Sequence, residues 1–214
     1  MHPRVLVREL LDHLAPDDPE AMRSRRDLRR INFLMGNERW LCRSIERFQK
    51  NTAAGIAEVG AGDGILCAKL AKKFPSAPVL GYDLAPRPPA LPSRVKWLQG
   101  DLFTQPRPQA GGIVIANLFL HHFEGEALSA LGSWLADAEV LIFNEPDRAR
   151  LPHLLGALLW PFINRVTHHD LHVSIAAGFS SGEIADLLGL ESQIWNFEET
   201  STWRGGRSMV AWRQ

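Results

Sequence analysis

Three glycines alternate with other residues in one short turn of this 214-residue chain. The turn follows the apolar run Gly55-Ile56-Ala57 and opens a helical pattern over residues 65–74; it reads Glu58-Val59-Gly60-Ala61-Gly62-Asp63-Gly64. Glycine lets the backbone turn tightly and lets a ligand approach main-chain N–H groups, and the N-terminus of the following helix carries partial positive charge. Strand, glycine turn and helix in this order predict a nucleotide-binding corner.

The spacing of these glycines disfavours a dinucleotide site. Such sites carry the pattern Gly-x-Gly-x-x-Gly. Here the position of the third glycine holds Ile65. A nicotinamide-dependent oxidoreductase therefore remains only as an alternative, which a comparison of NAD binding with the binding of other nucleotides would decide.

Carboxylates follow the next two predicted strands. The run Val79–Asp83 ends in Asp83, and the run Val95–Gln99 is followed by Gly100-Asp101-Leu102. Two acceptor oxygens at the carboxyl end of a strand suit the two hydroxyls of a ribose. The competing interpretation of Asp83 is an acidic turn residue before the proline-rich loop at 85–89.

Two further apolar runs predict a fourth strand at 112–117 and a fifth at 139–144. Continuous apolar character is typical of parallel strands covered on both faces. The fourth strand is followed by Asn117-Leu118-Phe119-Leu120-His121-His122-Phe123, and the fifth by Glu145-Pro146-Asp147-Arg148. Ligands of open α/β sheets bind where the carboxyl ends of the strands meet, so we expect these segments to lie at one site.

From about Gly55 to Arg148, the order of these segments resembles that of class I methyltransferases that use S-adenosylmethionine (SAM). The resemblance implies an α/β, Rossmann-like fold with a seven-stranded, mostly parallel sheet and an antiparallel last strand. It also implies an N-terminal helical cap (residues 1–50) on a SAM-binding domain (51–214), the two forming one structural domain. By family position, the residues expected to bind SAM are Glu58, Gly60, Ala61, Gly62, Gly64, Asp83, Leu84, Asp101, Leu102, Asn117 and Leu118.

The segment after Asn117 indicates a small-molecule enzyme. It lacks the Pro-Pro of enzymes that methylate nucleobase or amide nitrogens, and Asn117 is a poorer ligand for a hard cation than the Asp of the catechol type. Leu-His-His resembles quinone-pathway methyltransferases, and segments at 27–32, 144–148 and 169–179 resemble enzymes of polyketide and phenolic-lipid pathways. The implied reaction is O- or C-methylation of a small lipophilic, phenolic or polyketide-like acceptor; the alternative is a catalytically silent SAM-binding partner or regulatory subunit.

An apolar stretch at 151–163 is the predicted wall of the acceptor pocket, with ordinary core packing as the competing interpretation. Trp160, Glu145 and His121 are the predicted substrate contacts. His169, supported by Asp170, is the predicted base because an imidazole titrates near neutrality. His168 is the second candidate for the base, and His122 is a further catalytic candidate. The alternative is that the histidines of the predicted loop at 167–172 are solvated or structural. No metal is predicted, since the loop offers no cysteine partner.

The first 50 residues predict helices. Apolar positions indicate one at 5–14, Asp17 or Asp18 with Pro19 begins a second that ends at Gly36, and a third spans 38–48. In the second, Leu28, Ile31, Leu34 and Met35 are expected to turn inward.

Charge and composition narrow the partners and the compartment. The 24 basic and 24 acidic residues balance, which gives no general attraction to nucleic acid. Cys42 and Cys67 are expected to be buried, reduced thiols, because both lie in apolar helical patterns. The start of the chain lacks signal-peptide character, and no stretch is long enough for stable membrane insertion. The prediction is a cytoplasmic protein with a small-molecule partner and an undetermined oligomeric state.

Overall fold

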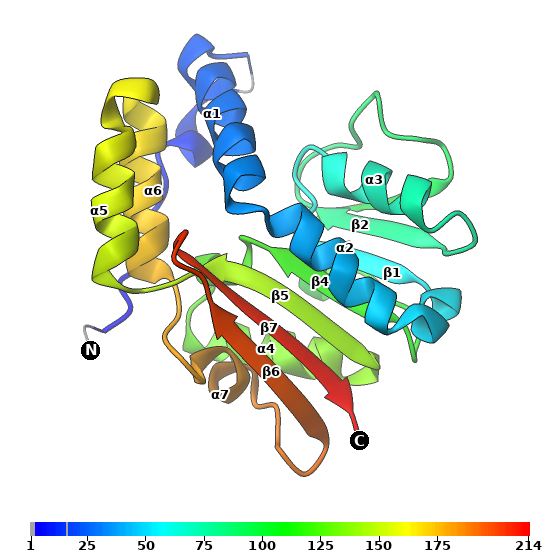
Figure 1. Ribbon diagram of the computed structural model, residues 1–214. Coiled ribbons are helices and arrows are strands. Elements are labelled where there is room, and N and C mark those ends of the chain that lie inside the picture. Colours follow the sequence, from blue (N-terminus) through cyan, green and yellow to red (C-terminus); the bar gives the residue numbers. More distant parts are fainter. Residues whose placement is uncertain (1–2, 16) are drawn as a thin grey trace.

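The computed structural model describes residues 3–15 and 17–214. Met1 and His2, which belong to the N-terminal segment analysed above for signal-peptide character, lie outside the described residues. One seven-stranded sheet forms the centre of the molecule (Figure 1), in the order β3-β2-β1-β4-β5-β7-β6. The strands are β1 (Ile56–Val59), β2 (Val79–Asp83), β3 (Val95–Gln99), β4 (Ile113–Asn117), β5 (Val140–Pro146), β6 (Trp195–Ser201) and β7 (Gly206–Arg213).

The pairing confirms the predicted sheet. Neighbouring strands from β3 to β5 run parallel, whereas β7 is antiparallel to both β5 and β6. Every residue of β5 is buried, in agreement with its continuous apolar sequence. The carboxyl ends of β1 to β5 therefore meet at one edge, as the sequence predicts.

Helices cover both faces of the sheet. The helices α2 (Asn37–Arg47) and α3 (Ile65–Lys73) pack on one face, and α4 (Gly125–Trp134) and α7 (Glu183–Leu188) on the other (Figure 1). Alternate strand residues point to opposite faces, so Ile113 and Ile115 join the first core while Val114 and Ala116 join the second. This two-sided core fixes the sheet edge at which the polar segments lie.

Three further helices cap the carboxyl edge of the sheet: α1 (Pro19–Met35), α5 (Arg150–Leu159) and α6 (Arg165–Ala177). Figure 1 shows α5 and α6 side by side, with α1 next to them. The start of α1 is capped by Asp18, whose side chain accepts a hydrogen bond from the Glu20 N–H, and its end lies at Gly36 with φ +78°. Both boundaries agree with the prediction.

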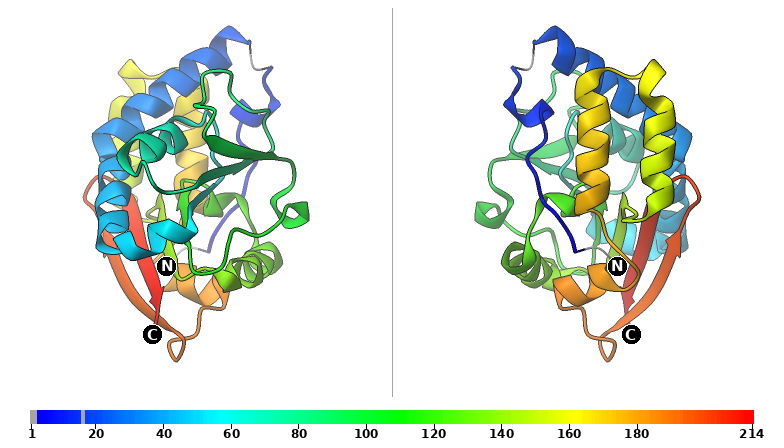
Figure 2. Two further views of the ribbon diagram at one scale, coloured as in Figure 1. Left: turned by 90° about the vertical axis from the view of Figure 1, so that its right-hand side faces the viewer. Right: turned by 90° about the vertical axis from the view of Figure 1, so that its left-hand side faces the viewer.

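Two predicted elements are corrected. Residues 5–14 are extended except for one short turn, because the N–H groups of Leu10 and Leu11 donate to the Asp170 carboxylate at 2.7 and 3.0 Å. Figure 2 shows this first segment running along α6. The histidine-rich residues 167–172 form the interior of α6 and not a loop, since Asn164 caps that helix by accepting from the Thr167 N–H at 2.8 Å.

Short 3₁₀ turns complete the chain. They are η1 (Leu11–His13), η2 (Gln49–Ala54), η3 (Leu102–Thr104), η4 (Leu120–His122), η5 (Leu135–Asp137) and η6 (Trp160–Phe162). Cys42 and Cys67 are both free thiols, as expected, but only Cys67 is buried and Cys42 is partly exposed. Among the described residues, none of the helices combines the length and apolar character that crossing a membrane requires.

Candidate active site

The glycine corner lies between β1 and α3, and its three glycines all adopt positive φ. The angles are +68° at Gly60, +54° at Gly62 and +71° at Gly64, in the region that only glycine enters readily. A Cβ atom on Gly62 would meet no atom within 4 Å, so this backbone faces open space. A Cβ on Gly60 would lie 2.1 Å from the Phe119 ring, so that glycine is required by close packing.

Asp83 and Asp101 lie along the same sheet edge. The Asp83 carboxylate accepts from the Gly62 N–H at 2.6 Å and the Ala85 N–H at 2.8 Å, which ties the end of β2 to the glycine corner. Asp101 is exposed and accepts from the Phe103 N–H at 3.0 Å. Leu84 next to Asp83 is 74% exposed, whereas Leu102 is buried. The edge thus presents carboxylates beside an uncovered apolar side chain, which suits a ligand with hydroxyls and a flat ring.

Glu58 lies beneath this corner in the protein interior. Its carboxyl group accepts from the Cys67 thiol at 3.0 Å, and burial raises the pKa of Glu58 to about 8. Burial also raises the pKa of the Cys67 thiol, which keeps its proton. At neutral pH the pair is mainly uncharged, because a lone charge without a cation beside it is costly to bury.

The end of β4 carries backbone strain. Leu118 has φ +57° and is the only non-glycine among the described residues with positive φ. Its N–H donates to the Asn144 carbonyl at 2.8 Å, and the side-chain oxygen of Asn117 accepts from the Asn144 amide at 3.2 Å. Strain of this kind persists where the surrounding structure holds it, often at ligand sites.

A cavity of about 660 Å³, here called the inner cavity, opens next to Asn117 and Leu118. Its walls are mainly apolar and come from α1, α5 and α6. Leu28, Ile31, Leu34 and Met35 all face it, as predicted for α1, although Leu34 is 62% exposed. The remaining lining residues are Glu9, Asn32, His121, His122, Pro146, Pro152, Leu155, Gly156, Leu158, Leu159, Leu171, Ser174, Ile175, Trp203, Arg204 and Gly205.

Glu145 does not contact this cavity. It is fully buried, and its carboxylate accepts from the N–H groups of Phe119 and Leu120 at 2.9 Å each, from the His121 N–H at 3.3 Å and from His121 Nδ1 at 2.8 Å. The predicted substrate contact is thereby corrected. Glu145 instead anchors the turn that carries the two histidines.

His121 and His122 lie in the cavity wall beside Glu9. His121 Nε2 is 3.7 Å from a Glu9 oxygen, and the Ser174 hydroxyl donates to the same oxygen. Desolvation lowers the pKa of His121, but the contacts with Glu145 and Glu9 outweigh it and raise that pKa to about 9. Glu9 is not predicted from the sequence, since no local spacing relates residue 9 to residue 121.

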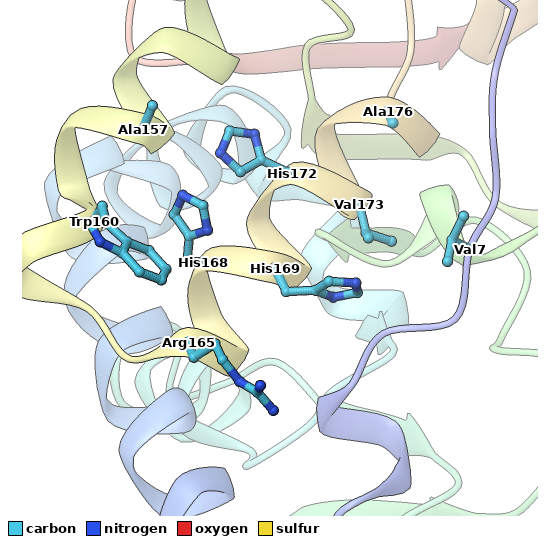
Figure 3. A pocket seen from close by; sticks show the side chains of 9 residues that line it. All are labelled: Val7, Ala157, Trp160, Arg165, His168, His169, His172, Val173 and Ala176. Atoms are coloured by element: carbon cyan, nitrogen blue, oxygen red, sulfur yellow. The ribbon is translucent and has the colours of Figure 1, made fainter.

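A second cavity of about 750 Å³, here called the outer cavity, lies on the opposite face of α6. Figure 3 shows Trp160, Arg165, His168, His169 and His172 around it; its other lining residues are Val7, Ala157, Val173 and Ala176. Among residues 3–15 and 17–214, none lines both this cavity and the inner cavity.

Three predicted site residues, Trp160, His169 and Asp170, lie away from the inner cavity. His169 Nδ1 lies 2.9 Å from the Asp170 carboxylate, and Trp160 packs edge-on against His168. Asp170 is buried and holds the first segment through Leu10 and Leu11. The structure therefore does not bring Trp160, His169 or Asp170 to the sheet edge.

Comparison with known proteins gives one set of sequence relatives. No known family profile matches the chain. Uncharacterised methyltransferases of Mycobacterium bovis and Mycobacterium tuberculosis are 34% identical over 123 residues, a match that covers 52% of this chain. The chain spans 62% of the length of these relatives.

Solved structures share the fold at low identity. The plantazolicin methyltransferase BpumL, in complex with a triazolic desmethyl-plantazolicin analogue and S-adenosylhomocysteine (SAH), superposes with a TM-score of 0.72 at 11% identity, over 92% of each chain. Magnesium protoporphyrin IX methyltransferase of Synechocystis with bound SAH gives 0.57 at 18% identity, over 87% of this chain and 93% of that one. Human N-acetylserotonin methyltransferase with SAM gives 0.57 at 14%, over 96% and 63%. These likenesses confirm the predicted class I methyltransferase fold.

Proposed function

We propose that the protein is a SAM-dependent methyltransferase that acts on a small lipophilic acceptor. The observation that carries this proposal is the junction at Asn117 and Leu118. Asn117 ends β4, which pairs with β1 beside the glycine corner, and Leu118 follows it; both residues also line the inner cavity. A cofactor on the sheet edge and an acceptor in the cavity would therefore meet there.

The sheet edge fits the proposed cofactor. The open backbone at Gly62 would receive the methionine end, Asp83 the ribose hydroxyls, and Asp101 with Leu102 the adenine, with exposed Leu84 as an apolar surface beside the ring. When bound, SAM supplies a methyl group on a sulfonium. The neighbouring enzymes that hold SAH or SAM on the same fold support this assignment.

The inner cavity fits a lipophilic acceptor. Leucines from α1, α5 and α6 line it and would exclude water from the reacting atoms. Such walls position an acceptor by shape, which is the main requirement for an in-line methyl transfer. We propose a phenolic or polyketide-like acceptor methylated at oxygen or carbon. The cavity also favours an enzyme over a silent SAM-binding partner, which would need no acceptor site.

An acceptor that must lose a proton would lose it inside this cavity. The titratable side chains there are those of Glu9, His121, His122 and Arg204. His169, the base predicted from the sequence, lines the outer cavity on the other face of α6. We therefore propose His122 as the proton acceptor, because burial and the neighbouring His121 lower its pKa, whereas His121, with a pKa of about 9, already holds its proton at neutral pH.

Transfer of label from methyl-tritiated SAM tests this function. The purified protein is incubated with a panel of alkylphenols, hydroquinones and 1,3-diketones, and label in the organic phase is counted. We expect label to pass to at least one acceptor with stoichiometric formation of SAH. Saturable SAM binding without label in any acceptor would instead favour the silent partner.

A further inference from the structure

Three side chains with metal-binding groups converge at the wall of the inner cavity. Glu9 comes from the extended first segment, and His121 and His122 come from η4. Their ligand atoms all lie within 4.8 Å of one another. Two imidazoles and one carboxylate are a ligand set of zinc and of other first-row transition metals, and a poor one for magnesium.

His121 is already oriented for such a role. Its Nδ1 lies 2.8 Å from the carboxylate of Glu145, which three backbone N–H groups hold in place. Its Nε2 is buried and has no hydrogen-bond partner among the described residues, and the whole residue is 4% exposed. A histidine that binds metal through one nitrogen commonly donates the other N–H to a carboxylate. This Nε2 makes no hydrogen bond and lies 3.7 Å from a Glu9 oxygen, so after loss of its proton it is the nitrogen that can bind an ion.

The position of the cluster gives an ion an entry path. Glu9, His121 and His122 line the inner cavity and also an adjoining cavity of about 420 Å³ next to the first segment. Glu9 is partly buried and His122 is exposed, so both side chains have room to turn toward an ion. Ligand bonds of about 2.0 to 2.2 Å require these two side chains to move closer to His121.

We propose that Glu9, His121 and His122 bind one divalent transition-metal cation, for which Zn²⁺ is the probe, at the wall of the inner cavity. Three protein ligands leave a coordination position open, and an oxygen of the acceptor would occupy it. With the ion bound, His122 would be a ligand, and the ion itself would lower the pKa of the acceptor oxygen. The ion would displace any proton from His121 Nε2, so binding releases protons. The proposal that an ion binds here does not depend on the proposed function, whereas the role of the ion toward an acceptor rests on the proposed methyl transfer. The proposal departs from the sequence-based expectation of no metal.

Titration of Zn²⁺ into the tag-free, metal-stripped protein at pH 7.5, followed by calorimetry, tests the site. We expect one ion per chain in the wild type. Glu9→Gln and His122→Ala should each weaken binding by about a hundredfold or more, since even outer partners of a ligand contribute 10- to 100-fold. His168→Ala, which removes an imidazole from the outer cavity, should leave the affinity unchanged. Mg²⁺ should show no saturable binding.

The proposal is overturned if the wild type binds no stoichiometric Zn²⁺, or if Glu9→Gln and His122→Ala bind it as tightly as the wild type. Loss of binding in His168→Ala alone would place the ion in the outer cavity and would overturn it too. Circular dichroism spectra of the same samples show that the variants are folded. SAM titrations separate the two proposals, because Zn²⁺ binding without SAM binding would contradict only the methyltransferase function.

Discussion

The two faces of α6 border cavities of similar size and different character. Leu171, Ser174 and Ile175 face the inner cavity, whereas His168 and His169 face the outer one. The outer cavity holds more imidazoles, but only the inner cavity reaches the end of β4. Residues three or four positions apart share a helix face, whereas adjacent residues point in different directions. His169 therefore lines the outer cavity, while Asp170 contacts the first segment. Contact with the sheet edge, more than the number of titratable groups, therefore favours the inner cavity as the proposed site.

Filling each cavity in turn should produce the largest difference. Leu155 and Ala157 lie on the same helix but line the inner and outer cavities, respectively. Leu155→Trp should lower kcat/KM for the acceptor by about a hundredfold or more, because it takes the space in which the acceptor must be oriented. SAM affinity, measured by calorimetry, should not change.

Ala157→Trp is the matched control for that substitution. It adds the same ring on the opposite side of the helix and should leave kcat/KM within about threefold of the wild type. Equal losses in both variants would mean that the two cavities do not differ in function. A loss in Ala157→Trp alone would move the acceptor to the outer cavity.

Substitution of single histidines should give the next largest difference, in kcat. His122→Ala should lower kcat by about 10- to 100-fold, as expected for loss of a proton acceptor or of a metal ligand in the inner cavity. His169→Ala should leave kcat close to that of the wild type, because its ring faces the outer cavity. Steady-state assays of the pair decide between this placement and the sequence-based prediction that His169 is the base.

Asp170 should influence stability more than chemistry. Asp170→Asn removes the charge that accepts the N–H groups of Leu10 and Leu11, and we expect a loss of about 1 to 3 kcal/mol in the free energy of unfolding. Urea denaturation measures it, with exposed Asp186→Asn as the control. If Asp170→Asn unfolds like the wild type but loses its turnover, the catalytic role predicted from the sequence is restored.

Glu58, beneath the glycine corner, should give the smallest effect, a change in how the free energy of unfolding depends on pH. The unfolded carboxyl loses its proton above about pH 4.5, whereas the folded one keeps it to about pH 8. The unfolded state then binds fewer protons, so stability falls as pH rises across this window. Between pH 6 and pH 7, the wild type should lose about 1 kcal/mol relative to Glu58→Gln in urea titrations. Parallel curves for the two proteins would show that Glu58 is not held protonated.

Local patterns predicted the fold because each element depends on its own residues. The alternating glycines, the apolar β5 and the Asp18 cap of α1 are all present as expected. The prediction of a helix at 5–14 was wrong because this segment donates hydrogen bonds to Asp170, far along the chain. For the same reason sequence spacing could not reveal that Glu145 holds η4, or that Glu9 meets His121. Long-range polar contacts, not local propensity, decide which side chains reach the cavity.

Calorimetric titration of SAM into the wild type and into Asp83→Ala tests the proposed cofactor site most directly. We expect one SAM per chain in the wild type, no saturable binding of NAD, and about 10- to 100-fold weaker SAM binding in Asp83→Ala. That loss corresponds to about 1 to 3 kcal/mol for hydrogen bonds to the ribose hydroxyls. Undetectable SAM binding in the wild type, or equal affinity in both proteins, would contradict the cofactor site at this sheet edge.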